Sequence, residues 1–162
     1  MSTNSNIGVL NKNGTVDAVY CHWDGYPSYN GKILTEHYIT AKKIKRLIEL
    51  GNISILASNI GKKHEFDKPN KNWCLFYGRD RGDKNVSHQT YSSVKDYENN
   101  HLEYNYLFKD KQWFVFNYNI NKFTSVPNYN VDIRKLISSS NRWYPVDVIL
   151  KLETAARHLR RV

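Results

Sequence analysis

Residues 7–23 have the pattern of a β-hairpin, and this pattern constrains the fold more than any other part of the chain. Apolar-rich stretches at 7–10 and 15–23 flank the pair Asn13-Gly14. Both residues of such a pair tolerate the positive φ of a tight hairpin turn. A second hairpin is predicted over 102–118, where aromatic and polar residues alternate on either side of a turn at 109–112. The chain therefore needs an antiparallel sheet.

Helical signals separate the two hairpins and close the chain. Residues 30–38 and 41–50 have apolar positions at helical spacing, and Thr40 and Gly51 stand where a cap and a stop are expected. Shorter helices are predicted near 92–99, with Ser92 or Ser93 as the cap, and near 131–138. Short strands are predicted at 53–56 and 73–77, with an exposed loop at 61–72. The last helix begins near Pro145 and should bury a stripe of Val148, Leu152, Ala155 and Leu159.

This order of elements predicts an α+β fold. We expect an antiparallel sheet of about five strands with helices packed mainly on one face. Neither an internal repeat beyond the two hairpins nor a composition shift marks a second domain, so residues 1–162 are expected to form a single domain.

The charge balance is strongly basic, with a formal net charge of +9. A basic surface favours polyanions or acidic protein faces as partners, and it argues against an acidic mimic of DNA. Two cysteines are too few for a disulfide framework, and no apolar run reaches the roughly 20 residues needed to span a bilayer. We therefore expect a cytosolic protein without a membrane partner.

The run at 20–27, Tyr-Cys-His-Trp-Asp-Gly-Tyr-Pro, concentrates functional groups beside a turn. Such density is typical of a binding or reactive surface. Strand alternation should place Tyr20, His22 and Asp24 on one side of the sheet, with the side chains between them on the other.

Two further stretches stand beside the run 20–27 and its continuation to 54: the N-terminal segment with Ser5, Ile7-Gly8 and Gly14-Thr-Val16, and Tyr77-Gly-Arg-Asp-Arg-Gly82. Together, the three stretches resemble a family of small, mostly uncharacterised phage-encoded proteins. The resemblance implies a phage gene product made in the cytoplasm of an infected bacterial host. By analogy with small accessory proteins of phages, it implies action on host machinery or host defence. It carries no activity with it.

Arg79 and Arg81 follow a predicted strand in a turn bounded by glycines. Two forked guanidinium groups can hold a phosphate, and nearby aromatic rings can stack on a base. The alternative is a turn in which these arginines pair with Asp80 or Asp83. If the turn lies beside the 20–27 run, a single ligand-binding hollow results. Its predicted residues are Tyr20, His22, Trp23, Asp24, Tyr26, His37, Arg79 and Arg81.

Catalytic and metal-binding interpretations of the same residues are weaker. Cys21 and His22 are neighbours in a strand and point to opposite faces, so His22 cannot readily activate the thiol. His22, Asp24 and His37 could hold a divalent ion only if they converged, and no His-x-His or Cys-x-x-Cys pair is present. No catalytic residue, metal or cofactor is therefore assigned from the sequence.

The sequence leaves three functions open. The first is a non-catalytic phage protein that counters a host process by binding an anionic, nucleotide-like small molecule or an acidic host protein. The second is a hydrolase or transferase acting on a nucleotide-type substrate, with His22 or His37 as general base. The third is direct nucleic-acid binding through the basic residues at 42–46 and 157–161. The oligomeric state is left open.

Overall fold

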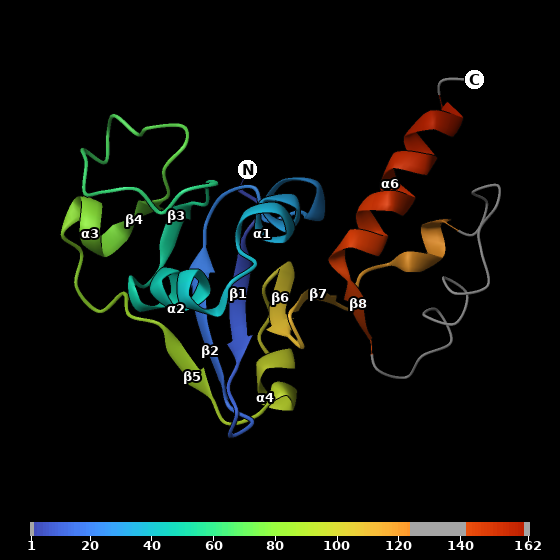
Figure 1. The fold of residues 1–162 in the computed structure, drawn as a ribbon, viewed down its shortest axis with the longest axis horizontal. Helices are drawn as coiled ribbons and strands as arrows, with labels where there is room; N and C mark the ends of the chain where they lie inside the picture. Colours follow the sequence, from blue (N-terminus) through green and yellow to red (C-terminus); the bar gives the residue numbers. More distant parts are fainter. Residues whose placement is uncertain (1, 124–141, 161–162) are drawn as a thin grey trace.

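An eight-stranded sheet forms the centre of the molecule (Figure 1). The computed structural model describes residues 2–123 and 142–160. The strands are β1 (Ser5–Leu10), β2 (Val16–Cys21), β3 (Ile53–Ile55), β4 (Leu75–Phe76), β5 (Gln89–Tyr91), β6 (Tyr104–Lys109), β7 (Gln112–Phe116) and β8 (Trp143–Pro145). Their order is β4-β3-β2-β1-β6-β7-β8, and β5 pairs with β2 off this path.

The prediction of about five strands is wrong, because the sheet has eight. The short strands predicted at 53–56 and 73–77 are present as β3 and β4, whereas β5 and β8, with three residues each, were not predicted. Three residues are too few to show an alternating pattern in the sequence. The sheet is mostly antiparallel, but β1 pairs with β6 and β2 pairs with β3 in parallel.

Both predicted hairpins are confirmed. β1 pairs antiparallel with β2 around the Asn13-Gly14 turn, where Gly14 has a φ of 89°. β6 pairs antiparallel with β7, with Lys109 opposite Gln112.

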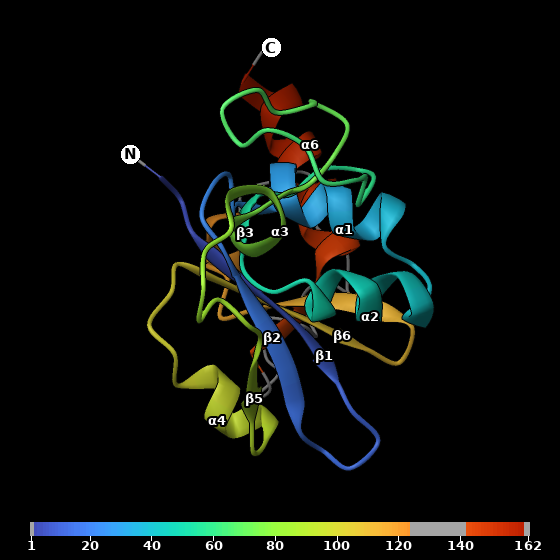
Figure 2. The same cartoon turned by 90° about the vertical axis from the view of Figure 1, so that its left-hand side faces the viewer.

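Helices cover both faces of the sheet unequally. The described helices are α1 (Lys32–His37), α2 (Ala41–Glu49), α3 (Tyr77–Arg81), α4 (Val94–Glu98) and α6 (Val146–Arg160), with a single π-helical turn, η1 (Pro27–Gly31), before α1 and a 3-10 turn, η2 (Ile120–Phe123), after β7. Figure 2 shows α1 and α2 on one side of β1 and β2, and α4 on the other.

The larger core lies between the sheet and the helices α1, α2 and α6. Ile7, Val19 and Cys21 on the sheet pack there with Leu47 of α2 and Ile149 of α6, and all five are at most 1% exposed. A smaller cluster on the opposite face contains Val16, Ala18, Leu107 and Tyr97, the last contributed by α4. The apolar alternation of β2 therefore serves two cores, one on each face.

Local sequence signals explain α2 and α4. Thr40 accepts a hydrogen bond from the amide of Lys43 at 3.3 Å, and Ser93 accepts one from Asp96 at 3.1 Å. These bonds satisfy amide groups that the first helical turn leaves unpaired. The Thr40 cap was predicted, and Ser93 is one of the two serines predicted as alternative caps for the second helix. The predicted apolar stripe of α2 is also buried, and it consists of Ile44, Leu47 and Ile48.

Two predicted elements differ in the structure. Residues 77–81 form the short helix α3 rather than a turn, and Gly82 ends it in the left-handed conformation at a φ of 82°. In α6 the predicted stripe is confirmed as far as Ala155, since Leu152 is 3% exposed and the partly buried Val148 and Ala155 pack against the larger core. Leu159 is 40% exposed, because only the N-terminal part of α6 packs against the sheet (Figure 1). The helix predicted at 131–138 and Arg161 lie outside the described residues.

Within the described ranges, no helix combines the length and the apolar composition that crossing a membrane requires.

Candidate functional site

Tyr20 and His22 lie side by side at the end of β2, as strand alternation predicts. The Tyr20 hydroxyl lies 2.6 Å from His22 Nδ1, and the two ring centroids are 6.0 Å apart. Burial raises the pKa of Tyr20, and its neighbour Tyr77 raises it further. The hydroxyl therefore keeps its proton at neutral pH, and it shares a hydrogen bond with Nδ1 of His22.

Cys21 faces the larger core and is not a nucleophile. Its side chain is fully buried, and this burial raises the pKa of its thiol to about 12. A reactive cysteine needs a thiolate and access to solvent, and Cys21 has neither. The sequence-based argument against a Cys21–His22 pair agrees with this placement.

The chain then turns sharply and exposes aromatic rings. Trp23 is 41% exposed, and its ring lies 4.8 Å from that of His22 in an edge-to-face arrangement. Tyr26 is 37% exposed, and its hydroxyl donates a hydrogen bond to Asp24 Oδ1 at 3.4 Å. Asp24 has a φ of 57°, so the backbone leaves the extended conformation of the strand there. The prediction that Asp24 shares a face of the sheet with Tyr20 is therefore wrong.

Much of the 20–27 run is structural. Gly25 passes so close to the N-terminal segment that a Cβ atom there would lie 2.7 Å from the backbone oxygen of Asn4. The Gly25 carbonyl accepts a hydrogen bond from the Tyr106 hydroxyl at 2.6 Å, and Asn30 donates one to the Trp23 carbonyl at 3.1 Å. These bonds fix the segment that follows β2 against the sheet and hold Trp23 in place.

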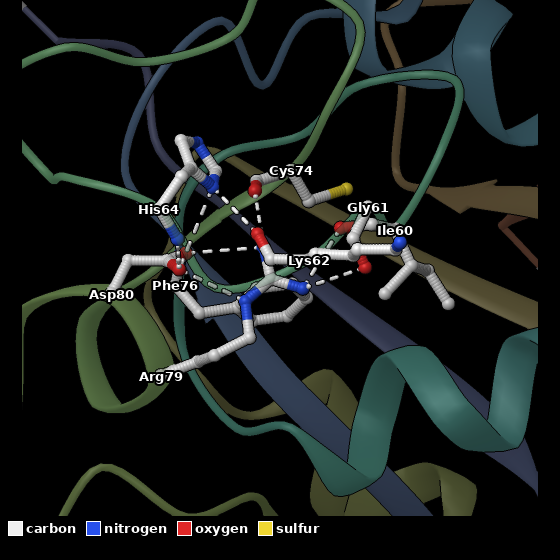
Figure 3. A network of polar contacts seen from close by, with 8 residues as sticks. All are labelled: Ile60, Gly61, Lys62, His64, Cys74, Phe76, Arg79 and Asp80. Carbon is white, nitrogen blue, oxygen red and sulfur yellow. Dashed lines mark hydrogen bonds and ion pairs between the residues drawn. The ribbon is translucent and has the colours of Figure 1, made fainter.

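Arg79 is committed to internal bonds and does not form the predicted anion clamp (Figure 3). Its guanidinium donates twice to the Asp80 carboxylate and also to the carbonyl groups of Ile60, Gly61 and Cys74. These bonds use all five N–H groups of the side chain. Arg79 therefore ties the 60–74 segment to α3, and it has no donor left for a phosphate.

Asp80 is the acceptor at the centre of the same network. Its carboxylate also accepts the backbone amides of Phe76 at 2.8 Å and His64 at 3.1 Å. Burial alone would raise the pKa of Asp80, but the hydrogen bonds from Arg79 and from these two amides outweigh it and hold the pKa below its ordinary value of 3.8. The network is a structural ion pair.

Arg81 lies on the surface and has a different environment. It donates to both Asp83 oxygens, at 2.9 and 2.7 Å, and its guanidinium lies over the rings of Phe66 and Tyr77. The two predicted arginines are therefore not equivalent. Solvent screens the ion pair between Arg81 and Asp83, so an anion could replace Asp83 as the partner of Arg81.

His37 does not join the other predicted residues. It ends α1, is exposed, and lies 3.8 Å from the carboxylate of Glu36. In the described part of the chain, no group of three potential metal-ligating side chains comes together, so His22, Asp24 and His37 do not converge.

The structure instead forms a polar pocket on the face of the sheet opposite the larger core. Asn6, Ala18 and Tyr20 form its floor, and its volume is about 370 Å³. One wall comes from Asn52 and the segment leading into β5, and the other from the loop between α4 and β6. The wall residues are Asn52, Asn85, Ser87, Gln89, Tyr91, Asn100, His101 and Leu102.

Five carboxamides line this pocket, and none of its eleven lining residues is a lysine, arginine, aspartate or glutamate. Asn6 is only 7% exposed, and its side chain forms no hydrogen bond with any described residue. Asn52 accepts the amide of Tyr20 at 3.1 Å, which leaves its NH2 group for the pocket. The pocket therefore offers both donors and acceptors on a neutral surface.

Of the eight predicted site residues, Tyr20 alone lines this pocket, and the sequence analysis missed the asparagines. Asparagine is common in loops of this chain, so its identity carried little signal. The sequence signal that could have identified the pocket was Asn6, because it lies within a buried strand and a buried amide normally has a hydrogen-bond partner.

The fold and the pocket define a mixed α/β protein built on a mostly antiparallel sheet, with a neutral, amide-lined pocket on one face. Comparisons of the chain with protein-family models, curated proteins and solved structures found no match.

Proposed function

We propose that this protein is a non-catalytic binding protein that captures a small ligand carrying a neutral, hydrogen-bonding ring of the nucleobase type. The observation that carries the proposal is the pocket beside Tyr20, which has five carboxamides and no fully charged side chain. In a chain with a net charge of +9, a pocket without a lysine or arginine favours a neutral group over a phosphate.

Carboxamides suit the edge of a nucleobase. Each one presents a donor and an acceptor in a plane, and asparagine or glutamine can pair with adenine through two hydrogen bonds. Tyr20 and Tyr91 add aromatic surface next to these groups. The volume of about 370 Å³ lies within the range of small-molecule sites.

The anionic part of a nucleotide-like ligand would remain outside the pocket. Arg81 supports this version of the proposal because its guanidinium packs on Tyr77, which neighbours Tyr20. Arg79 gives no such support, since its donors are occupied.

The wider role that we propose is that of a phage accessory protein that counters a bacterial defence in the host cytoplasm. The likeness of the Tyr-Cys-His-Trp-Asp-Gly-Tyr-Pro run to phage-encoded proteins supports it. Capture of a nucleotide-type signal is a role that a binding protein can perform without catalysis.

Isothermal titration calorimetry with the four ribonucleosides, their monophosphates and cyclic dinucleotides tests the proposal. The decisive variant is Asn6→Leu, which keeps the shape of the side chain and removes its hydrogen-bonding groups. Because the Asn6 amide has no partner among the described residues, this change leaves the folding of the protein intact. We expect affinity for the bound nucleoside to fall by roughly 5- to 100-fold, since one ligand group loses its partner.

Asn72→Leu is the matched control, because Asn72 is an exposed asparagine outside the pocket. Its affinity should equal that of the wild type. Absence of heat with every probe would overturn the proposal. Recovery of an altered ligand after the protein is denatured would favour the enzymatic alternative, and binding to mixed-sequence RNA that falls steeply with salt would favour the nucleic-acid alternative.

A further inference from the structure

A row of aromatic rings leads from the pocket to the protein surface. Tyr20 lines the pocket, its hydroxyl is bonded to His22, and Trp23 packs against His22. The ring-to-ring steps are 6.0 Å from Tyr20 to His22 and 4.8 Å from His22 to Trp23. The exposed indole is therefore two ring contacts away from the pocket floor.

The indole is held in place although it is 41% exposed. The amide of Trp23 donates to the Ser54 carbonyl at 3.1 Å, and its carbonyl accepts from Asn30 at 3.1 Å. The residues two positions away on either side are also fixed, because Cys21 is buried and Gly25 packs closely against the backbone of Asn4. An exposed aromatic ring on a rigid backbone loses little freedom when it stacks on a ligand.

We infer that Trp23 is a second stacking subsite, so that the ligand carries two linked rings, one in the amide-lined pocket and one on the indole. This inference rests on the proposed function, because the first ring must occupy the pocket. Every nucleobase has a face that can stack on an aromatic side chain, so the second subsite tolerates different bases. The linker between the rings would pass over Tyr20 and His22, and a dinucleotide has this form.

Three probes of one base separate the subsites: adenosine, adenosine monophosphate and the dinucleoside monophosphate ApA, with the uridine series as a second set. For wild type we expect ApA to bind more tightly than either single-base probe. Trp23→Ala should weaken ApA by about tenfold and leave both single-base probes unchanged. Trp23→Phe should retain most of the ApA affinity, because it keeps an aromatic face.

Tyr29→Ala is the matched control. Tyr29 is 39% exposed, like Trp23, but its ring neighbour is Tyr26, outside the row that leads to the pocket. This variant should bind ApA as the wild type does. Adenosine monophosphate controls for simple attraction of the phosphate to a basic protein.

Two results would overturn the inference in distinguishable ways. If adenosine or uridine binds and ApA or UpU has no advantage, or if Trp23→Ala weakens all three probes alike, the second subsite does not exist and the pocket proposal stands. If neither these probes nor the guanosine and cytidine probes of the first titration bind to the wild type, both proposals are wrong.

Discussion

Single residues of the same type have opposite roles in this molecule. Arg79 and Arg81 are two positions apart, yet the Arg79 side chain is 12% exposed within a five-donor network, whereas Arg81 is 48% exposed beside Asp83. The sequence predicted the partners Asp80 and Asp83 as one alternative. It did not predict that only one of the two arginines is committed to the fold, because the carbonyl acceptors of Arg79 come from residues 60, 61 and 74.

Arg79→Ala should therefore destabilise the protein strongly. The substitution leaves the Asp80 carboxylate buried without its cation, and breaking such a buried pair costs about 3–5 kcal/mol. Urea denaturation followed by tryptophan fluorescence measures this loss. Arg81→Ala is the matched control, and its unfolding midpoint should stay close to that of the wild type because its ion pair is solvated. Equal losses for the two variants would contradict the assignment of Arg79 as the structural arginine.

Whole elements follow from the sequence where their signals are local. The Asn13-Gly14 turn, the Thr40 cap and the stripe of α2 were all predicted, and the cap of α4 was narrowed to Ser92 or Ser93, since each depends on residues within one or two turns. Local signals do not show what surrounds the end of a helix. Gly51 after α2 and Gly82 after α3 both have positive φ, but Gly51 packs against another segment of the chain and Gly82 does not.

Gly51→Ala should cost more stability than Gly82→Ala. Both substitutions place a side chain at a φ above 80°, which costs roughly 1–2 kcal/mol. At Gly51 a Cβ atom would also clash with the backbone oxygen of Val86, whereas nothing lies within 4 Å at Gly82. Thermal unfolding of the pair measures the difference. A lower melting temperature for Gly82→Ala than for Gly51→Ala would contradict the close packing of residues 86–87 against Gly51.

At the scale of the whole molecule, distant segments meet on the sheet. The pocket combines Asn6 of β1, Tyr20 of β2, Asn52 before β3, the 85–91 segment and the 100–102 loop. The larger core likewise joins Cys21 of β2 to Cys74, which comes directly before β4. Cys74 is held by the Tyr38 hydroxyl at 3.2 Å and by the amide of Ala57 at 3.3 Å.

Both thiols should react only when the molecule unfolds. Cys21 and Cys74 are fully buried, and burial raises the pKa of each thiol. Modification by a thiol reagent at pH 8 under native conditions should be slow and should accelerate with urea in parallel with loss of the folded state, since both cysteines lie in one core. Rapid labelling of either cysteine in the native protein would contradict the packing of that core.

The sequence by itself determined the two hairpins, the capped helices, the α+β class and the inert Cys21, because each depends on neighbours along the chain. Only the tertiary structure decided that short strands widen the sheet to eight and that β1 and β6 pair in parallel. It also decided that Arg79 is internal and that four asparagines from four separate segments line a neutral pocket. These features depend on contacts between residues dozens of positions apart, and no local pattern of side chains encodes which distant segments pair.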